Sequence, residues 1–304
     1  MIAVIIYYLL ILPLSWLPFS ALYKLSDALY YLIYGFFKYR KTVVAGNIKR
    51  SFPDKTASQL LEIEKGFYRH LCDLVVEGIK GFSISKKEAL ERMTITNPEE
   101  LDQYFDKGKS VVIVGGHYAN WEMFALAIDH NIKHQAVALY APLTNKLADE
   151  KVRSSRSKFG LHMLSIHEIR ENLAKTNEVL TATIFGADQA PSKKQRAYWM
   201  TFLNQETPIQ FGTEKFAAEY DMPVVNGVIS KISRGFFEVT FSTICEDSSA
   251  QEFGFITQKH TRLLEAAIEA KPEYWLWSHK RWKRQRPEDE PLHERLPLIK
   301  GAKF

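Results

Sequence analysis

The residues most able to do chemistry lie within one short stretch, from His117 to Glu122. An apolar run over 111–114 leads into Gly115 and Gly116, then His117, and a helical pattern starts near Glu122. An imidazole can take a proton from a hydroxyl group when a carboxylate holds its other ring nitrogen in one tautomer. On one continuous helix, residues five apart would point about 140° away from each other. We therefore expect His117 on the turn and Glu122 in the first helical turn, as a general base and its partner.

The same two residues also fit a purely structural interpretation, in which His117 caps the helix and Glu122 favours its positive end. Their setting favours catalysis, because ligand sites of α/β proteins gather at the carboxyl ends of strands. Gly116 leaves room for a substrate to approach the backbone closely. With no serine or cysteine nucleophile in a recognisable motif, the nucleophile would be a hydroxyl group of the substrate.

The elements that must position this stretch alternate between short strands and helices. Runs typical of strands cover 110–114, 136–140, 179–185, 224–229 and 236–241, and helical patterns cover 122–129, 146–159 and 213–220. A further helix should begin near Thr56, with Gln59 completing a capping box. Strands separated by helices predict an α/β fold, with a central mixed β-sheet flanked by helices. The turn before residue 236 predicts a hairpin, which makes the sheet mixed.

The amino-terminal segment is apolar and predicts attachment to a membrane. The first 23 residues carry no charged side chain, although Pro13 and Pro18 interrupt the run. Two forms of attachment stay open, a single membrane span and a hairpin lying in one leaflet. The alternative to attachment is a buried helix pair in a soluble protein. We expect an anchor over 1–41 and a second domain, which carries the catalytic stretch, over 42–304. The basic cluster after the apolar run, Lys38, Arg40 and Lys41, would place the domain in the cytoplasm.

Composition narrows the classes of partner and cofactor. The formal net charge is +5, which fits an acidic partner or an anionic membrane without requiring nucleic acid. The chain has two cysteines, Cys72 and Cys245, and neither a CxxC nor an HExxH arrangement, so we expect no metal site. No P-loop or GxGxxG is present, so no nucleotide cofactor is implied.

The stretch 117–122 is similar to the HX4D/E motif of glycerolipid acyltransferases, in the glutamate form typical of the late acyltransferases of lipid A biosynthesis. Other segments resemble that family in the same order along nearly the whole chain: Asn47 with Ser51-Phe52-Pro53, Tyr140-Ala141-Pro142-Leu143-Thr144-Asn145, Arg153, Arg156, Phe159-Gly160, Asp188-Gln189, Gly212-Thr213 and Tyr274-Trp275-Leu276-Trp277-Ser278-His279-Lys280-Arg281-Trp282-Lys283. Several motifs in one order are far more specific than any single one.

The resemblance implies transfer of a fatty acyl chain from acyl-carrier protein, or less typically acyl-CoA, to a hydroxyl group of a lipid A precursor. The donor is a substrate, so no cofactor is implied. Arg153 or Arg156, with the backbone at Gly116, would stabilise the oxyanion. Asp188 would either pair with one of the arginines or shape the acceptor site, although Asp is also a common turn residue. Gln189 is expected to bind substrate. The implied location is the bacterial inner membrane, with the catalytic domain on its cytoplasmic face.

Two further hypotheses stay open. The acceptor could be another membrane lipid, such as a glycolipid, an aminolipid or a lysophospholipid. The chain could also be a non-catalytic lipid-binding membrane protein. The aromatic and basic residues over 275–286 suit a membrane interface or contact with an acyl carrier.

Overall fold

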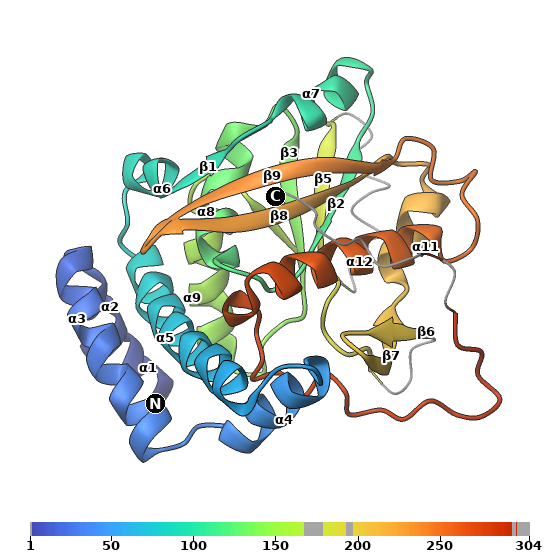
Figure 1. Ribbon diagram of the computed structural model, residues 1–304. Helices are drawn as coiled ribbons and strands as arrows, with labels where there is room; N and C mark the ends of the chain where they lie inside the picture. The colour runs from blue at the N-terminus through green and yellow to red at the C-terminus, as the bar shows by residue number, and fades with distance from the viewer. Residues whose placement is uncertain (1, 167–178, 193–196, 294–295, 297–304) are drawn as a thin grey trace.

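A seven-stranded mixed sheet forms the centre of the computed structural model, which describes residues 2–166, 179–192, 197–293 and 296 (Figure 1). The strand order is β1-β9-β8-β2-β5-β3-β4. Only the hairpin of β8 and β9 is antiparallel, and every other neighbouring pair is parallel. The sheet strands are β1 (Met93–Ile95), β2 (Val111–Gly115), β3 (Gln135–Tyr140), β4 (His162–Ser165), β5 (Thr181–Gly186), β8 (Val224–Ser233) and β9 (Phe236–Cys245).

The α/β class, the mixed sheet and all five predicted strands are confirmed. Two sheet strands were missed, β1 and β4, which have three and four residues and are too short to display a periodic pattern. A separate antiparallel hairpin was also missed, formed by β6 (Ala197–Phe202) and β7 (Gln205–Gln210).

Helices flank the sheet on both faces (Figure 1). They include α4 (Lys41–Ser51), α5 (Ala57–Gly81), α6 (Lys86–Arg92), α7 (Glu99–Asp106), α8 (Trp121–Asn131), α9 (Lys146–Arg156), α11 (Gly212–Glu219), α12 (Phe255–Ala270) and the short 3₁₀ helix η3 (Pro272–Tyr274). The predicted start of α5 is confirmed, since Thr56 and Gln59 form a reciprocal capping box.

Strand β2 is buried on both faces, which explains why its sequence is a continuous apolar run rather than an alternating one. Val111 and Ile113 pack in the hydrophobic cluster that contains Leu126 of α8. Val112 and Val114 pack in a second cluster, together with Phe216 of α11 and Ile256 of α12. The central strand is therefore held rigidly from both sides, and its carboxyl end is a fixed point for the residues that follow.

The amino-terminal segment is helical but does not form the expected membrane span. In the described part of the chain, no helix combines the length and the apolar character needed to cross a membrane. The first helical stretch, α1 (Ile2–Ile6), η1 (Tyr7–Ile11) and α2 (Leu12–Ser15), ends before Pro18. A second stretch follows, α3 (Phe19–Tyr30) and η2 (Tyr31–Phe36). A residue before proline avoids helical backbone angles, so the chain breaks at this point.

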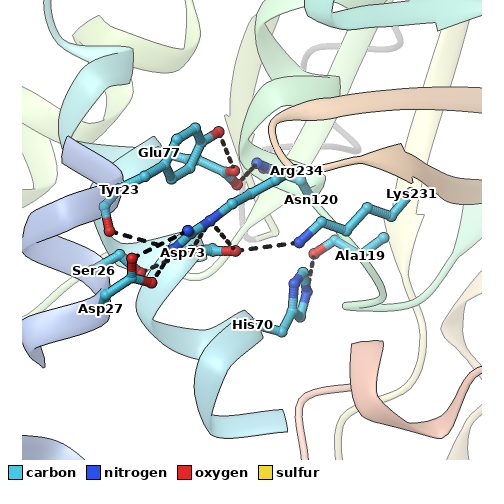
Figure 2. Close-up of polar contacts among 10 residues, drawn as sticks. All are labelled: Tyr23, Ser26, Asp27, His70, Asp73, Glu77, Ala119, Asn120, Lys231 and Arg234. Atoms are coloured by element: carbon cyan, nitrogen blue, oxygen red, sulfur yellow. Dashed lines mark hydrogen bonds and ion pairs between the residues drawn. The ribbon is translucent and has the colours of Figure 1, made fainter. Parts of the chain in front are cut away.

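A buried polar network ties α3 to the body of the protein (Figure 2). Asp73 of α5, which is 5% exposed, lies at its centre. Its carboxylate accepts hydrogen bonds from Ser26 Oγ (2.8 Å) and Arg234 Nη2 (2.7 Å), and Lys231 Nζ lies 3.3 Å away. Arg234 also reaches Asp27 on α3, at 2.7 Å. The network therefore joins the amino-terminal helices, α5 and the β8–β9 hairpin.

Asp73→Ala should lower the free energy of unfolding by about 3 kcal/mol, because it leaves two cations facing each other without their shared anion. Chemical denaturation followed by circular dichroism would measure the change. The control is Asp106→Ala, which removes an ion pair between Asp106 and Lys133 at the surface. The Asp106 side chain is 62% exposed, so the denaturation midpoint should stay unchanged. Equal midpoints for the two variants would contradict the proposed importance of the network.

Candidate active site

The pairing of β2 with β5 decides which residues meet at the carboxyl edge of the sheet. The two strands run parallel, and Gly115 lies opposite Gly186 in the register. The backbone N–H of Ala187 donates to the carbonyl of Gly115, at 2.9 Å, and extends the strand pairing one residue beyond β5. His117 and Asp188 each follow two residues after one of the paired glycines. The two side chains are 71 residues apart in sequence and emerge at the same point.

His117 and Asp188 form a tight pair. The distance from His117 Nδ1 to Asp188 Oδ1 is 2.7 Å, and the backbone N–H of His117 donates to Asp188 Oδ2 at 3.0 Å. Trp275 Nε1 donates to the same Oδ2, at 2.9 Å. An ionised carboxylate only accepts hydrogen bonds, so Nδ1 carries the proton and Nε2 is left as the basic nitrogen. The side chain of His117 is 28% exposed and that of Asp188 is 3% exposed.

The surroundings of the pair favour an ionised aspartate and a basic imidazole. Burial alone would raise the pKa of Asp188, but the charge and hydrogen bonds of His117 and the bond from Trp275 lower it to about 2. For His117, burial lowers the pKa and the charge and hydrogen bond of Asp188 raise it, with a net pKa above the ordinary value. A base with a raised pKa takes a proton from a weakly acidic hydroxyl more readily.

Glu122 does not hold the imidazole, contrary to the sequence prediction. It is the second residue of α8, and its carboxylate forms a two-point contact with Arg156, with Nε to Oε2 at 2.8 Å and Nη2 to Oε1 at 2.5 Å. Trp121 Nε1 donates to Oε1 as well, at 3.1 Å. The guanidinium fork matches a carboxylate well, so Glu122 is already engaged. The partner of His117 is Asp188, which arrives from the neighbouring strand.

The two predicted arginines have different positions. Arg156 lies near His117, since its charge lowers the pKa of that imidazole, and its Nη1 has no partner among the described residues. Arg153 is exposed and lies against Tyr140, with 5.7 Å from Cζ to the ring centroid. Asp188 pairs with neither arginine. Of the two, Arg156 is the one whose charge acts on His117.

Gln189 and two glycines complete the immediate surroundings of His117. The side-chain nitrogen of Gln189 lies 3.5 Å from His117 Nε2. A Cβ atom at Gly116 would lie 2.8 Å from Leu264 Cδ2 and 3.3 Å from the carboxylate carbon of Asp188. A Cβ at Gly186 would lie 3.2 Å from His117 Cε1. The missing side chains therefore let the imidazole and the carboxylate approach each other.

A second part of the polar network supports the turn after His117 from behind (Figure 2). Ala119 has a positive φ of 51°, a strained conformation for a residue with a side chain. Its carbonyl accepts a hydrogen bond from His70 Nε2, at 3.1 Å. Asn120 donates to Glu77 at 2.6 Å and accepts from the backbone N–H of Met123, which caps α8. Helix α5 therefore fixes the turn that carries His117.

The carboxyl-terminal segment contributes to the site from inside the core, and its role was missed in the sequence. Trp275 and Trp277 are 2% and 0% exposed, so the expected contact of these two side chains with a membrane or a carrier is wrong. Trp275 instead forms a bridge with Tyr118 and bonds Asp188. Asn47 donates to the carbonyls of Trp277 and His279, both at 3.0 Å. Two segments quoted for the family resemblance are thus in direct contact.

The arrangement suits base catalysis on a hydroxyl group. In the described ranges, no group of three or more His, Cys, Asp and Glu side chains gathers as a metal site would require. His117 Nε2 is the basic nitrogen of a side chain that is 28% exposed, Asp188 fixes the tautomer, and Arg156 supplies a positive charge nearby. These are the parts that proton removal and oxyanion stabilisation need.

Asp188→Asn should move the pKa of His117 from above its ordinary value to below it. The substitution removes the negative charge that raises the pKa, while burial, which lowers it, remains. Titration of the imidazole by NMR would measure the midpoint. Asp247→Asn, at an exposed carboxylate, serves as the control and should leave the midpoint in place. A midpoint that stays above the ordinary value in Asp188→Asn would contradict the assigned pairing.

Comparison with known proteins identifies the family of the chain. The family model described as bacterial lipid A biosynthesis acyltransferase matches residues 1–284. No curated protein matches the chain. The matched range contains the His117 turn, the Asp188 loop and the Trp275 segment. The chain belongs to the bacterial lipid A biosynthesis acyltransferase family and is an enzyme that transfers acyl groups.

Proposed function

We propose that the protein transfers a fatty acyl chain from a thioester donor, acyl-carrier protein, to a hydroxyl group on a lipid A precursor. The family supports an acyltransferase that acts in lipid A biosynthesis. The finer assignment is a secondary acylation, in which the hydroxyl group belongs to a 3-hydroxyacyl chain already on the precursor. The observation that carries the chemistry is the 2.7 Å pair of His117 Nδ1 and Asp188 Oδ1.

The proposed reaction needs one proton relay. His117 Nε2 takes the proton of the acceptor hydroxyl as its oxygen attacks the thioester carbonyl. The tetrahedral intermediate collapses to an ester and expels the thiolate, which takes the proton from the imidazolium. Asp188 holds the imidazole and stabilises its protonated form. Atoms and charge therefore balance with no further reactant.

Arg156 is proposed as the cation that faces the developing oxyanion or a phosphate of the acceptor. Its Nη1 group, which has no partner among the residues described, and the effect of its charge on His117 support this role. Glu122 is assigned the task of holding the guanidinium plane, which explains why the motif ends in a carboxylate. Gln189, 3.5 Å from His117 Nε2, is proposed to contact the acceptor hydroxyl. Arg153 and the Gly116 amide remain predictions for substrate contact.

His117→Ala should lower acyl transfer by at least about 100-fold, since it removes the general base. The assay follows release of free carrier from labelled acyl-carrier protein, with a lipid A precursor as acceptor. His130→Ala, which removes an exposed histidine of α8, the helix that follows the His117 turn, is the matched control and should keep full activity. Undiminished turnover of His117→Ala would refute the assignment.

Mass spectrometry of lipids from cells with and without the protein would identify the acceptor. One additional acyl chain on lipid A supports the proposed acceptor. Unchanged lipid A with a newly acylated glycolipid, aminolipid or lysophospholipid would keep the chemistry and replace the acceptor. A protein that only binds lipid would release no free carrier.

We further propose that the enzyme works at the cytoplasmic face of the inner membrane and binds it with its two amino-terminal helical stretches. Large apolar side chains on both stretches and directly beside them are exposed: Val4, Ile5, Ile6, Tyr8, Leu9, Leu10, Trp16, Leu17, Tyr31, Leu32, Phe36 and Phe37. The basic residues Lys38, Arg40 and Lys41 follow directly. Exposed apolar side chains beside cations are typical of helices that lie in a membrane interface.

Leu9 and Phe36, which are 75% and 76% exposed, provide the test of membrane binding. Changing both to serine should lower flotation with vesicles of phosphatidylethanolamine and phosphatidylglycerol several-fold, because apolar contact with the acyl chains is lost. The control changes Ile232 and Phe253, which are 61% and 60% exposed on other elements, to serine. If the control loses as much binding as the test variant, the proposed face is wrong.

A further inference from the structure

Arg281 is a buried cation with few partners. It is 1% exposed, and its Nη1 donates to Thr207 Oγ1 at 2.7 Å. Its Nε and Nη2 atoms have no hydrogen-bond partner among the residues that the structure describes. Burial lowers the pKa of Arg281 to about 10, while Asp188 raises it, so the side chain stays charged near neutral pH. A buried charge without partners is costly, so this position calls for a physical reason.

A small cavity lies between this guanidinium and the catalytic pair. Its volume is about 10 Å³, and its walls include Asp188, Arg281, His260 and Leu264. His260 Nε2 also has no hydrogen-bond partner in the described ranges. The volume suits one water molecule, and a water needs two to four polar neighbours. The walls offer that number.

Asp188 retains the capacity to accept one more hydrogen bond. An ionised carboxylate has about four acceptor positions. Oδ2 accepts from the backbone of His117 and from Trp275, and Oδ1 accepts from His117 Nδ1. A further position on Oδ1 is therefore left, and Asp188 forms part of the cavity wall.

We propose that Arg281 is a positioning residue that acts on His117 through Asp188, by way of one water molecule held in this cavity. The water bridges the guanidinium to the carboxylate, and the positive charge stabilises the ionised form of Asp188. This inference rests on the proposed roles of His117 and Asp188. It assigns to the Arg281 of the carboxyl-terminal motif a function in tuning the base, from a place that no substrate reaches.

The direction of the effect follows from the charges around the pair. The other titratable or charged groups that act on His117 and Asp188 are Glu122, Arg156, His260 and His279. Burial lowers the pKa of His260 to about 4 and also lowers that of His279, so both are neutral near pH 7. With Arg281 present, part of the negative charge of Asp188 is balanced. Without it, Asp188 acts on His117 with its full charge, and the pKa of His117 rises.

Arg281→Met should therefore move the His117 midpoint, measured by NMR titration, and the acid limb of kcat/KM to higher pH by about one pH unit. Apolar replacement of a buried charge by a side chain of similar volume is often tolerated. Arg262→Met is the matched control, because Arg262 is also buried, at 5% exposed, but is paired with Glu265 at 2.7 Å. The control should leave the midpoint unchanged, even if it lowers the unfolding temperature.

Three outcomes would overturn the inference. The first is a His117 midpoint in Arg281→Met that equals that of the unaltered protein. The second is a His117 midpoint that Arg281→Met shifts as far in the Asp188→Asn protein as in the unaltered protein. A residue that acts through Asp188 should have no effect once the Asp188 carboxylate is removed. The third needs no variant: a high-resolution crystal structure of the unaltered protein with no water between Arg281 and Asp188. If His117→Ala keeps its activity, the proposed function fails instead.

Discussion

The parallel register of β2 and β5 is the constraint on which the site depends. It places Gly115 opposite Gly186, so that the chains leaving the two strands deliver His117 and Asp188 to one point. A shift by one residue would turn every side chain of a strand to the opposite face, and the pair would separate. The core packing on both faces of β2 holds this register.

Burying the carboxylate of Asp188 requires compensation, and the fold supplies it with three hydrogen bonds from two segments. The backbone and ring of His117 donate from the β2 turn, and Trp275 donates from the segment after α12. Asn47 of α4 in turn holds the carbonyls of Trp277 and His279. The turn after β2 and the carboxyl-terminal segment thus converge on a single anion, and α4 holds the carboxyl-terminal segment. These contacts explain physically why segments far apart in sequence, around Asn47, His117, Asp188 and Trp275, depend on one another.

The amino-terminal helices are integrated with the catalytic turn rather than attached as a separate anchor. Tyr23 of α3 donates to Glu77 of α5, at 2.9 Å, and Glu77 in turn accepts from Asn120, which caps α8. Burial, with the charge of Asp73, raises the pKa of Glu77 to about 7. A short path of hydrogen bonds therefore connects the helices proposed to contact the membrane with Asn120, three residues after His117.

Local sequence determined the elements and half of the site. The apolar run of β2, the two glycines and the cap of α5 are short-range features, so the α/β class, five strands and the position of His117 could be predicted from them. The partner of His117 could not, because the carboxylate at the correct distance along the chain, Glu122, is engaged by Arg156. Strand order placed Asp188 there instead, since β5 lies next to β2 in the sheet although β3, α9 and β4 separate the two strands along the chain. Spacing along a chain reports on one helix or turn, whereas contacts between strands depend on the fold of the whole domain.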